Sequence, residues 1–554
     1  MKKLAAMLLA IAMLVPIAGC GSDNAVPVEP TAAASQPAQS SGVGAAVAEA
    51  EPGLLRVAAL YDISTMDVAH TTDNYMVPMN VFDRLFESEV QADGSTAVVP
   101  SLCENYEVSE DGLTYTFHLR ENVTFSNGSE FAADDVAYTF TRLLTEGGVN
   151  DDVALEVLGA QALKSGDADE LAGVEIIDGH TVQVTLETAN AGFLAELTGP
   201  AMSIVDRETT ESASSFGIAC EDTVGTGPYK ITEWVVNDHY TLERNDGYWG
   251  EEPSVKKMIV YIIPDASTQN LMFQNGELDI IDLESIDSVI VESTYKTQYA
   301  DRLVVSSRVG LLYFALNENN TYLSDVNVRR AIQMAIDADA IVESIYAGDA
   351  VVENGIIPVG VWGYNASLER PAYDPEAAKQ LLAEAGYSDG EISFELSLDS
   401  SASGNVQLVY QVIQQYLAAI GINAEIKSYD ESSWLDLRKS GEMDSFVANW
   451  TMDYNDPANI MFTFFGSADK TGIRSLNYAN EAVMQRVAAA SGITDDAERL
   501  AEYQELERII VSDDAAWVPL LGNTHLFAIG ERVASFVPYW AGFSNFYAKN
   551  VTLK

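Results

Sequence analysis

The order of strand and helix signals within residues 392–426 constrains the fold more than any other feature of this sequence. Residues 392–398 have the apolar pattern of a strand, and a helical pattern follows at about 406–420. Gly421 stops that helix, and a second strand pattern occupies 422–426. A strand, a helix and a strand in this order predict a right-handed parallel crossover unit. We therefore expect a protein of the α/β class.

Other stretches carry the same mixed character. Asp374 is placed to cap a helix, Pro375 fits its first position, and Gly386 can adopt the left-handed conformation that ends it. Near the C-terminus a helical pattern at about 495–511 leads into an apolar strand pattern at 516–521. Mixed sheets and helices of this kind predict two lobes, and such proteins commonly bind a small ligand in the crevice between them.

The first twenty residues have the pattern of a secretion signal. Lys2 and Lys3 precede an apolar run at 4–15, which is too short to span a bilayer comfortably. The run is followed at 17–20 by Ile-Ala-Gly-Cys, which resembles the bacterial lipobox. In that motif small residues admit the peptidase, and the Cys thiol receives a diacylglyceryl group. Cys20 is therefore the predicted lipid attachment site; the alternative is an ordinary secretory signal with an accidental Cys.

The N-terminal region is expected to divide into two parts before the folded chain begins. Residues 1–19 are the predicted lipoprotein signal peptide. Residues 20–50 are rich in Ala, Ser, Pro, Gly, Gln and Val and have no apolar period, so they predict a flexible lipid-anchored tether. The folded part is then expected outside the cytoplasm, held at the outer face of the cell membrane.

The chain is strongly acidic, with 83 Asp and Glu against 30 Lys and Arg and a formal net charge of -53. Such a charge repels phosphate backbones, so nucleic acid is excluded as a partner. A cationic ligand is permitted by this charge. The simpler interpretation is a solvated acidic surface suited to an extracellular medium.

Three cysteines occur in the sequence. With Cys20 lipidated, Cys103 and Cys220 remain as a candidate disulfide in an oxidising compartment. Their spacing does not place them within bonding reach, so a bridge and two free thiols both stay open.

Several landmarks occur together in one order along the folded chain. Any one of them is weak, but the ordered set resembles the peptide- and nickel-binding extracellular solute-binding proteins of family 5, over nearly the whole folded region. The landmarks are TYTFHLRENVTFSNGSEFAADDVAYTFTRLL at 114–144, GTGPY at 225–229, LERNDGYW at 242–249, DVNVRRAIQMAID at 325–337, DPEAAKQLLAEAG at 374–386 and WTMDYNDPAN at 450–459.

The resemblance implies a periplasmic-binding-protein-like fold of three domains with a hinged cleft. The first domain is assembled from separated parts of the chain, and the third opposes it across the cleft. Two chain crossings form the hinge. On this sequence the first domain is expected at 51–83, 207–309 and 514–554, the second at 84–206 and the third at 310–513.

The segment WTMDYNDPAN contains the clearest candidate ligand contact. In peptide-binding members of the family the matching Asp receives the free amino group of the peptide, so the resemblance implies this role for Asp453. Trp450 and Tyr454 are expected to wall the site. The alternative is that Asp453, Asn455 and Asp456 only cap a turn before Pro457.

Further cleft residues follow from the way these relatives hold the peptide main chain. They add the ligand as a strand, which tolerates any sequence because every peptide offers the same N–H and C=O groups. The strands that contain Tyr313 and Asn449 are expected to face the ligand. Thr72 and Asp73, in an early loop of the first domain, are additional candidates.

One departure from the family bears on the cargo. Dipeptide-binding relatives place an Arg after a third-domain strand to hold the ligand carboxylate, but the corresponding loop here, 399–405, reads DSSASGN. A clamp for dipeptides of fixed length is therefore in doubt, and oligopeptides are favoured. The expected role is the substrate-binding subunit of an ABC importer. It would act as a monomer without a cofactor and deliver peptides to permease subunits that work with ATPases.

Other binding functions compete with peptide capture. Metal-chelate binding is disfavoured because the histidines show no paired ligand spacing. Oligosaccharide binding would use aromatic stacking in the same cleft. The histidines are His70, His118, His180, His239 and His525, and the tryptophans that could stack are Trp362, Trp434, Trp450 and Trp540.

An acyl-enzyme of penicillin-binding type is the alternative from a different class. S-x-x-K begins at Ser293, S-x-N at Ser403 and K-T-G at Lys470, in the order that such enzymes use. The last motif should lie on an apolar strand, yet here it falls in the polar stretch GSADKTGIRS. The sequence also has no G-x-x-x-x-G-K-[ST] loop for a nucleotide. We therefore expect a binding protein and no enzyme.

Overall fold

The computed structural model describes most of the region that the sequence predicts to fold, and all described residues belong to one unit of the chain, Glu49–Lys554. The predicted signal peptide, Cys20 and the tether lie outside the described residues, as do Thr72 and Asp73. No helix within the described ranges is both long and apolar enough to cross a membrane. Those ranges are 51–71, 74–91, 96–307, 309–541 and 546–554.

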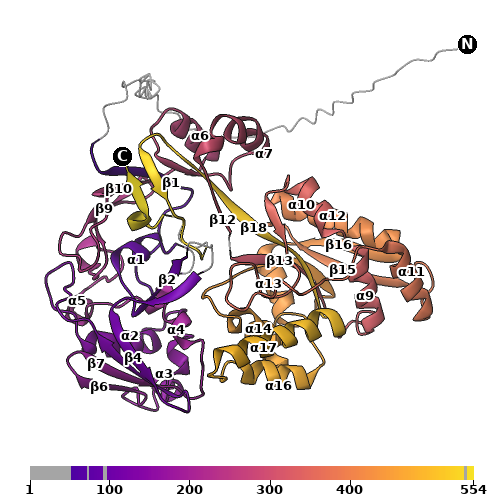
Figure 1. The fold of residues 1–554 in the computed structure, drawn as a ribbon, viewed down its shortest axis with the longest axis horizontal. Helices are drawn as coiled ribbons and strands as arrows, with labels where there is room; N and C mark the ends of the chain where they lie inside the picture. Colours follow the sequence, from indigo (N-terminus) through magenta and orange to yellow (C-terminus); the bar gives the residue numbers. More distant parts are fainter. Residues whose placement is uncertain (1–50, 72–73, 92–95, 308, 542–545) are drawn as a thin grey trace, which may run out of the picture. The chain divides into compact units, whose positions relative to one another are not determined.

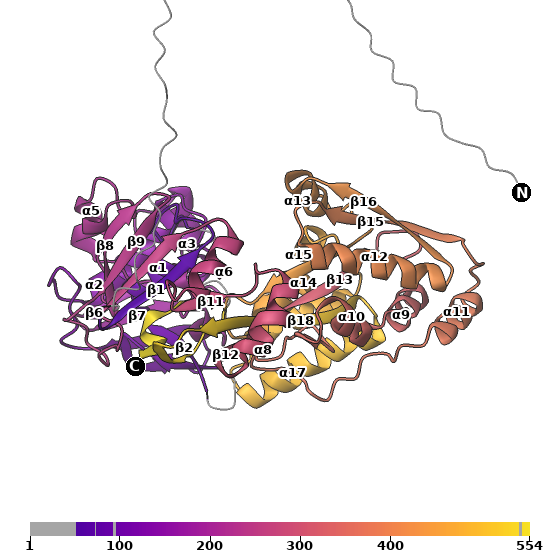
Figure 2. The ribbon, with the colours of Figure 1, turned by 90° about the horizontal axis from the view of Figure 1, so that it is seen from above.

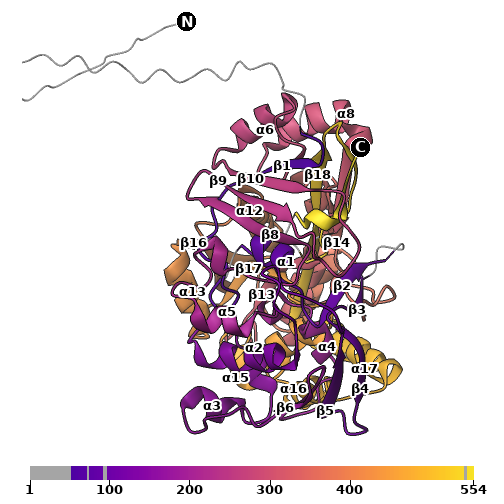
Figure 3. The same ribbon diagram turned by 90° about the vertical axis from the view of Figure 1, so that its left-hand side faces the viewer.

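A four-stranded sheet joins the start of the described chain to strands nearly two hundred residues later. Its strands are β1 (Leu54–Ala59), β8 (Tyr229–Val235), β9 (His239–Arg244) and β10 (Lys257–Ile262). The order is β1-β10-β9-β8, with β1 parallel to β10 and the other neighbours antiparallel (Figure 3). Met258, Val260 and Ile262 of β10 are buried while the residues between them are half-buried. This alternation is typical of a strand with one more deeply covered face.

A second, fully antiparallel sheet has the order β4-β5-β7-β6. Its strands are β4 (Cys103–Val108), β5 (Thr114–Leu119), β6 (Val174–Asp178) and β7 (Thr181–Thr185). The alternation predicted for β5 is confirmed, since Tyr115, Phe117 and Leu119 are buried and the residues between them are not. Helix α2 (Ala133–Thr145) packs against β6 and β7, and its N-terminus is capped because Asp135 accepts a hydrogen bond from the amide of Ala132.

The largest sheet contains the predicted crossover unit. Strand β15 (Ile392–Asp399), helix α12 (Gly404–Ala419) and strand β16 (Ile422–Tyr429) follow one another, and β15 and β16 are parallel, as predicted. Helix α12 packs along both strands (Figure 2). The sheet order is β11-β18-β13-β17-β15-β16, with β12 and β14 also paired to β18. The remaining strands are β11 (Ile280–Asp282), β12 (Leu303–Ser307), β13 (Gly310–Leu316), β14 (Ala350–Val352), β17 (Ser445–Thr451) and β18 (Trp517–Ile529).

Strand β18 connects the two halves of this sheet (Figure 1). Its C-terminal part pairs with β11 and β12, which precede residue 310, and its N-terminal part pairs with β13 and β14. Strand β18, which the predicted bounds place wholly in the first domain, therefore also pairs with strands of the predicted third domain.

Shorter strands and the other helices surround these sheets. Among them, α11 begins at Pro375 after the predicted Asp374 cap, whose side chain accepts from the amide of Ala377 at 2.9 Å. Gly386 has the expected positive φ of 96°. The bounds are β2 (Phe86–Val90), β3 (Thr96–Pro100), β19 (Val533–Phe536), β20 (Val551–Leu553), α1 (Met76–Val81), α3 (Ala160–Ser165), α4 (Phe193–Glu196), α5 (Arg207–Ser212), α6 (Ala266–Gln274), α7 (Ser288–Ile290), α8 (Lys296–Gln298), α9 (Val326–Ala335), α10 (Ala338–Ile345), α11 (Pro375–Glu384), α13 (Glu431–Lys439), α14 (Ala458–Phe465), α15 (Ala468–Gly472), α16 (Glu481–Ala490) and α17 (Asp496–Arg508).

The buried apolar side chains form several clusters. One cluster draws almost wholly on the predicted second domain, around β4, β5 and α2. Another lies between α9, α10, α12 and the strands β13, β15 and β16, in the predicted third domain. A third, around β1, β8, β9 and β10, joins the separated segments of the predicted first domain. These three clusters lie mainly within one predicted domain each, whereas a fourth cluster joins Met79 and Trp540 of the predicted first domain to residues of the third.

The candidate bridge between Cys103 and Cys220 is not formed, because both side chains are free thiols. Cys103 is buried in the cluster of the second sheet, whereas Cys220 packs at the edge of the cluster around the first sheet. Burial raises the pKa of Cys103 to about 12, so its thiol stays protonated and unreactive. The two cysteines belong to different cores, a separation that their sequence spacing did not reveal.

Candidate functional site

A cavity of about 1080 Å³ is lined by segments that are far apart in the sequence. These segments fall in all three predicted domains, so the cavity lies where a cleft between them is expected. Its volume is at the upper end of the range for ligand pockets and can hold a ligand of several residues. Most of its lining residues lie within 58–62, 74–76, 150–156, 196–201, 282–285 and 450–474.

Acidic side chains dominate the charged lining of this cavity. Lys470 and Arg474 are the basic residues among the described lining residues. A surplus of carboxylates lowers the free energy of a cationic group that enters the cavity. The acidic residues are Asp62, Asp152, Glu156, Glu196, Asp282, Glu284 and Asp453, and burial keeps Glu196 protonated at neutral pH by raising its pKa.

Asp453 follows the end of β17 and lines the cavity, as do Trp450 and Tyr454. One carboxylate oxygen of Asp453 accepts a hydrogen bond of 2.9 Å from the side-chain amide of Asn459, at the start of α14. The same Asn459 accepts from the Trp450 indole at 3.0 Å, so one amide positions both candidate contacts. Asp453 keeps solvent exposure into the cavity, but burial among the cavity walls raises its pKa. A cationic amino group placed here would stabilise the ionised carboxylate.

Tyr454 joins Asp453's loop to a buried pair of carboxyl groups. Its hydroxyl donates to Glu196, and the amide of Asn190 donates to both Glu156, at 2.8 Å, and Glu196, at 3.0 Å. Burial, and then the neighbouring charge of Glu156, raise the pKa of Glu196 well above its usual range. Glu196 is therefore a neutral, hydrogen-bonding wall of the cavity at neutral pH.

Asp456 stabilises the turn of this loop, which is the structural role that was the alternative to ligand binding. It is buried, accepts from Arg499 at 2.6 Å, and accepts from the amide of Ala458 at 2.9 Å at the start of α14. Neighbouring Asn455 donates to the carbonyl of Thr96 at 3.0 Å. The loop is thus fixed directly after Asp453, while Asp453 itself lines the cavity.

Tyr313 lies in the core, away from the cavity lining. Its side chain is 1% exposed, and its ring stacks on Trp517 with centroids 4.2 Å apart. Strand β13 is buried at every position and has β17 on one side and β18 on the other. A ligand therefore cannot add to β13, contrary to the expected use of this strand, because both of its edges are already paired.

Asn449 lies on β17, and its side chain is exposed but does not line the cavity. One edge of β17 pairs along its whole length with β13, whereas β15 meets the other edge only at Ser445. The Tyr410 hydroxyl satisfies the amide and carbonyl of Val447 on that second edge. The part of β17 beyond Val447 is thus the edge, among the described strands of this region, that a peptide main chain could use.

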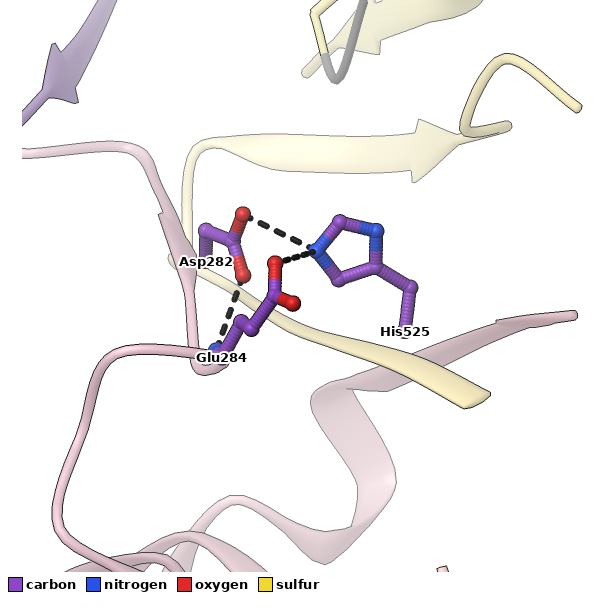
Figure 4. A group of neighbouring side chains, drawn as sticks. All are labelled: Asp282, Glu284 and His525. Carbon is purple, nitrogen blue, oxygen red and sulfur yellow. Dashed lines mark hydrogen bonds and ion pairs between the residues drawn. The ribbon is translucent and has the colours of Figure 1, made fainter. Parts of the chain in front are cut away.

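His525 on β18 contacts two carboxylates that line the cavity (Figure 4). Its Nε2 lies 3.1 Å from Asp282 and 3.2 Å from Glu284. Burial alone would lower the pKa of His525, but the hydrogen bonds to both carboxylates outweigh it and raise the pKa to about 9. The three side chains could in principle hold a metal ion. A metal ion bound there would displace the proton from Nε2, so its binding would be pH-dependent.

The fragments that resemble an acyl-enzyme do not assemble into one site. Ser293 donates to the carbonyl of Val289 within its own helix, and Lys296 pairs with Glu292 and Asp349 at 2.6 Å. Lys470 lies in helix α15 and on the cavity wall, where Ser293 does not contribute. A nucleophile activated by a nearby Lys is therefore not built from these residues.

Some residues of the cavity were not anticipated from the sequence. Arg474, Glu196 and Glu284 line it, but each stands in a stretch without a recognisable motif. The one signal available for Arg474 is its place shortly after the Asp453 motif, in the polar stretch GSADKTGIRS. Only the tertiary fold brings these side chains to the same cavity as Asp453.

Comparison with known proteins gives a consistent result. The family model described as bacterial extracellular solute-binding proteins, family 5 Middle, matches residues 97–472. Heme-binding protein A of Haemophilus influenzae is 30% identical over 483 residues, covering 85% of this chain and 87% of that protein. The dipeptide-binding protein of Escherichia coli is 29% identical over 486 residues, covering 84% of this chain and 88% of that protein.

A solved structure extends the likeness to three dimensions. The ABC transporter-associated periplasmic binding protein DppA from Helicobacter pylori, in complex with the peptide STSA, superposes with a TM-score of 0.69 and 29% sequence identity. The match covers 90% of this chain and 98% of that protein. The mixed α/β fold described above is therefore that of the two-lobed periplasmic binding proteins.

Proposed function

Because the chain belongs to the bacterial extracellular solute-binding proteins of family 5, we propose that it is the substrate-binding subunit of an ABC importer for peptides. The observation that carries this proposal is Asp453. Its carboxylate faces a large cavity, has a pKa raised by burial, and is positioned together with the Trp450 ring by one side-chain amide. Such a carboxylate suits the free amino group at the start of a peptide.

The names of some of the similar proteins support the same cargo class, whereas one relative is a heme-binding protein. One relative is a dipeptide-binding protein, and the Helicobacter pylori protein was solved with a peptide of four residues. We propose oligopeptides for this chain, because the loop at 399–405 offers no basic side chain for a dipeptide clamp. The open edge of β17 beyond Val447 can pair with a peptide main chain of any sequence.

The proposed mechanism is closure of the cleft around the peptide. Strand β18 pairs with strands of both the predicted first and third domains, so bending along this strand would bring the cavity walls together. Closure removes water from around Asp453, which strengthens its interaction with an ammonium group. The loaded state would then dock on permease subunits, with ATP hydrolysis supplied by separate ATPases.

The proposed location is the outer face of the cell membrane. Cys20 would carry the lipid, and residues 20–50 would hold the binding domains away from the bilayer. The apolar run at 4–15 and the Ile-Ala-Gly-Cys motif support this assignment. Mass spectrometry of the membrane-associated protein would test it, since a Cys20→Ser variant should lose the diacylglyceryl mass and the membrane association.

Native mass spectrometry of the protein purified gently without its lipid tests the cargo class. Closed clefts retain ligand, so we expect a ladder of added masses that denaturation releases as peptides. Sequencing of the released peptides should show varied side chains, because main-chain pairing is tolerant of sequence. A porphyrin, a sugar or a metal chelate in place of peptides would contradict the cargo assignment, as would an empty protein that binds no member of a peptide library.

A further inference from the structure

Most arginines of this acidic chain are neutralised by a carboxylate. Among the described residues, the guanidinium groups of Arg438 and Arg474 are exceptions that neither form a salt bridge nor donate a hydrogen bond to the protein. Two arginines without a hydrogen-bonding partner in a chain with 83 acidic residues need an explanation, because most of the other described arginines pair with a carboxylate. The like charge of Arg438 acts on Arg474.

Arg474 occupies a position from which a ligand can be reached. It lines the cavity in the loop that follows α15. Its guanidinium lies 5.1 Å from the centroid of the Trp450 ring and 5.2 Å from that of Phe464, so two aromatic faces hold it in place. Its Nε is buried and has no hydrogen-bond partner in the described part of the chain. The Nε atoms of the ion-paired Arg142 and Arg499 are buried in the same way, so what distinguishes Arg474 is that no carboxylate of the described chain pairs with its guanidinium.

Asp453 does not neutralise Arg474, although both line the same cavity. The Asp453 carboxylate accepts its side-chain hydrogen bond from Asn459 and forms no salt bridge with Arg474. The two opposite charges are still close enough to influence each other electrostatically. The cavity wall therefore presents a negative group and a positive group side by side, separated by more than a direct ion pair.

We propose that Arg474 receives a carboxylate of the cargo, so that the ligand carries a free carboxylate close to the amino group held by Asp453. This inference rests on the proposed function and narrows its cargo class. A guanidinium fork can bind both oxygens of a carboxylate, and the aromatic faces beside it already fix its plane. It supplies the cation that the loop at 399–405 lacks.

Two sources of the carboxylate fit this chemistry. One is the C-terminus of a short peptide, and the other is an Asp or Glu side chain near the N-terminus of a longer peptide. Matched peptides separate them in isothermal titration calorimetry on the lipid-free protein. Ala-Ala-Ala against its C-terminal amide tests the first source, and Ala-Glu-Ala-Ala amide against Ala-Gln-Ala-Ala amide tests the second.

We expect the loss of the carboxylate in at least one pair to weaken binding by about 10- to 100-fold, the range for a hydrogen bond to a charged group. In Arg474→Gln the two members of that pair should bind alike, and Arg474→Lys should recover only part of the difference. Arg508→Gln is the matched control for lost positive charge, because Arg508 pairs with Glu505 on the surface outside the cavity. It should keep the full difference.

Equal binding of the charged and neutral members of both pairs to the unaltered protein would overturn this inference and leave the peptide function standing. A difference that persists undiminished in Arg474→Gln would also overturn it. The comparison in the unaltered protein does not depend on the folding of any variant. If no peptide binds at all, the proposed function itself fails, and the inference fails with it.

Discussion

His525 shows how one residue on β18 links charge to stability. Its imidazole bridges Asp282 and Glu284, and although burial opposes protonation, these hydrogen bonds raise its pKa to about 9. An unfolded histidine titrates near 6.5. A raised pKa means that the stabilisation is complete below about pH 6.5 and is lost as the pH rises toward 9.

Replacement of His525 by Gln removes this titration. Urea unfolding of both proteins at pH 6 and pH 9 should show that the stability advantage of the unaltered protein over His525→Gln shrinks by about 3 kcal/mol between these values. An advantage that stays constant with pH would contradict the ion-pair assignment. His118→Gln, at a partly exposed position of β5, is the control for general effects of removing a histidine.

Single residues of the site could be predicted where they lie within a recognisable sequence motif. Trp450, Asp453 and Tyr454 stand within one motif, and all three line the cavity. Tyr313 does not line the cavity. Strand β13 is central and buried at every position, so its sequence pattern does not reveal which of its side chains could contact a ligand. Arg474 was not predicted. It stands out because no carboxylate of the described chain pairs with its guanidinium, and the absence of such a tertiary contact cannot be inferred from the sequence.

At the scale of elements, the segment after β14 rests on two buried carboxyl groups. Glu507, near the end of α17, accepts from the amides of Ile356 and Ile357 at 2.7 and 2.8 Å, and Glu353 accepts from the amide of Val359 at 3.2 Å. Burial raises the pKa of Glu353 to about 8 and that of Glu507 to about 7. Both groups therefore hold their protons in the folded state at pH values where the unfolded chain has lost them.

A carboxyl group whose pKa is raised by folding lowers the free energy of unfolding as the pH increases above its pKa in the unfolded chain. The reason is that the unfolded state then binds fewer protons than the folded state. Glu353→Gln keeps an oxygen to accept from Val359 but does not titrate. We expect it to match the unaltered protein at pH 5 and to exceed its unfolding free energy on the order of 3 kcal/mol at pH 8. Glu343→Gln, on the exposed side of α10, should change little at either pH. Equal pH profiles for all three proteins would refute the account.

Local signals predicted several elements well. The strand β5, the capped helix α11 and the β15-α12-β16 crossover all follow from periodicity and from Asp, Pro and Gly at their ends. Strand β18 was predicted only at 516–521, whereas it continues to Ile529. The polar residues at 522–525 do not have a sequence pattern typical of a strand. Their extended conformation is held by pairing with β12 and β14. Long-range pairing of this kind is outside the reach of local patterns.

The acidic composition of the whole chain agrees with the excess of acidic residues in the cavity lining. The net charge of -53 permitted a cationic ligand, and the cavity lining is itself rich in carboxylates. Basic residues are few, so the placement of Lys470 and Arg474 on the cavity wall is specific. In the proposed complex, the amino group of the cargo binds at Asp453 and its carboxylate binds at Arg474.

Titration of Asp453→Asn with a matched pair of peptides tests the central claim most directly. One peptide has a free amino terminus and the other is N-acetylated, with otherwise identical sequence. In the unaltered protein acetylation should weaken binding by about 10- to 100-fold, because the charged hydrogen bond to Asp453 is lost. In Asp453→Asn the free peptide should bind correspondingly more weakly and acetylation should cost little further, as expected for two groups that act on each other. If the unaltered protein binds both peptides equally, or if acetylation costs as much in Asp453→Asn, the amino group does not bind at Asp453 and the account is contradicted.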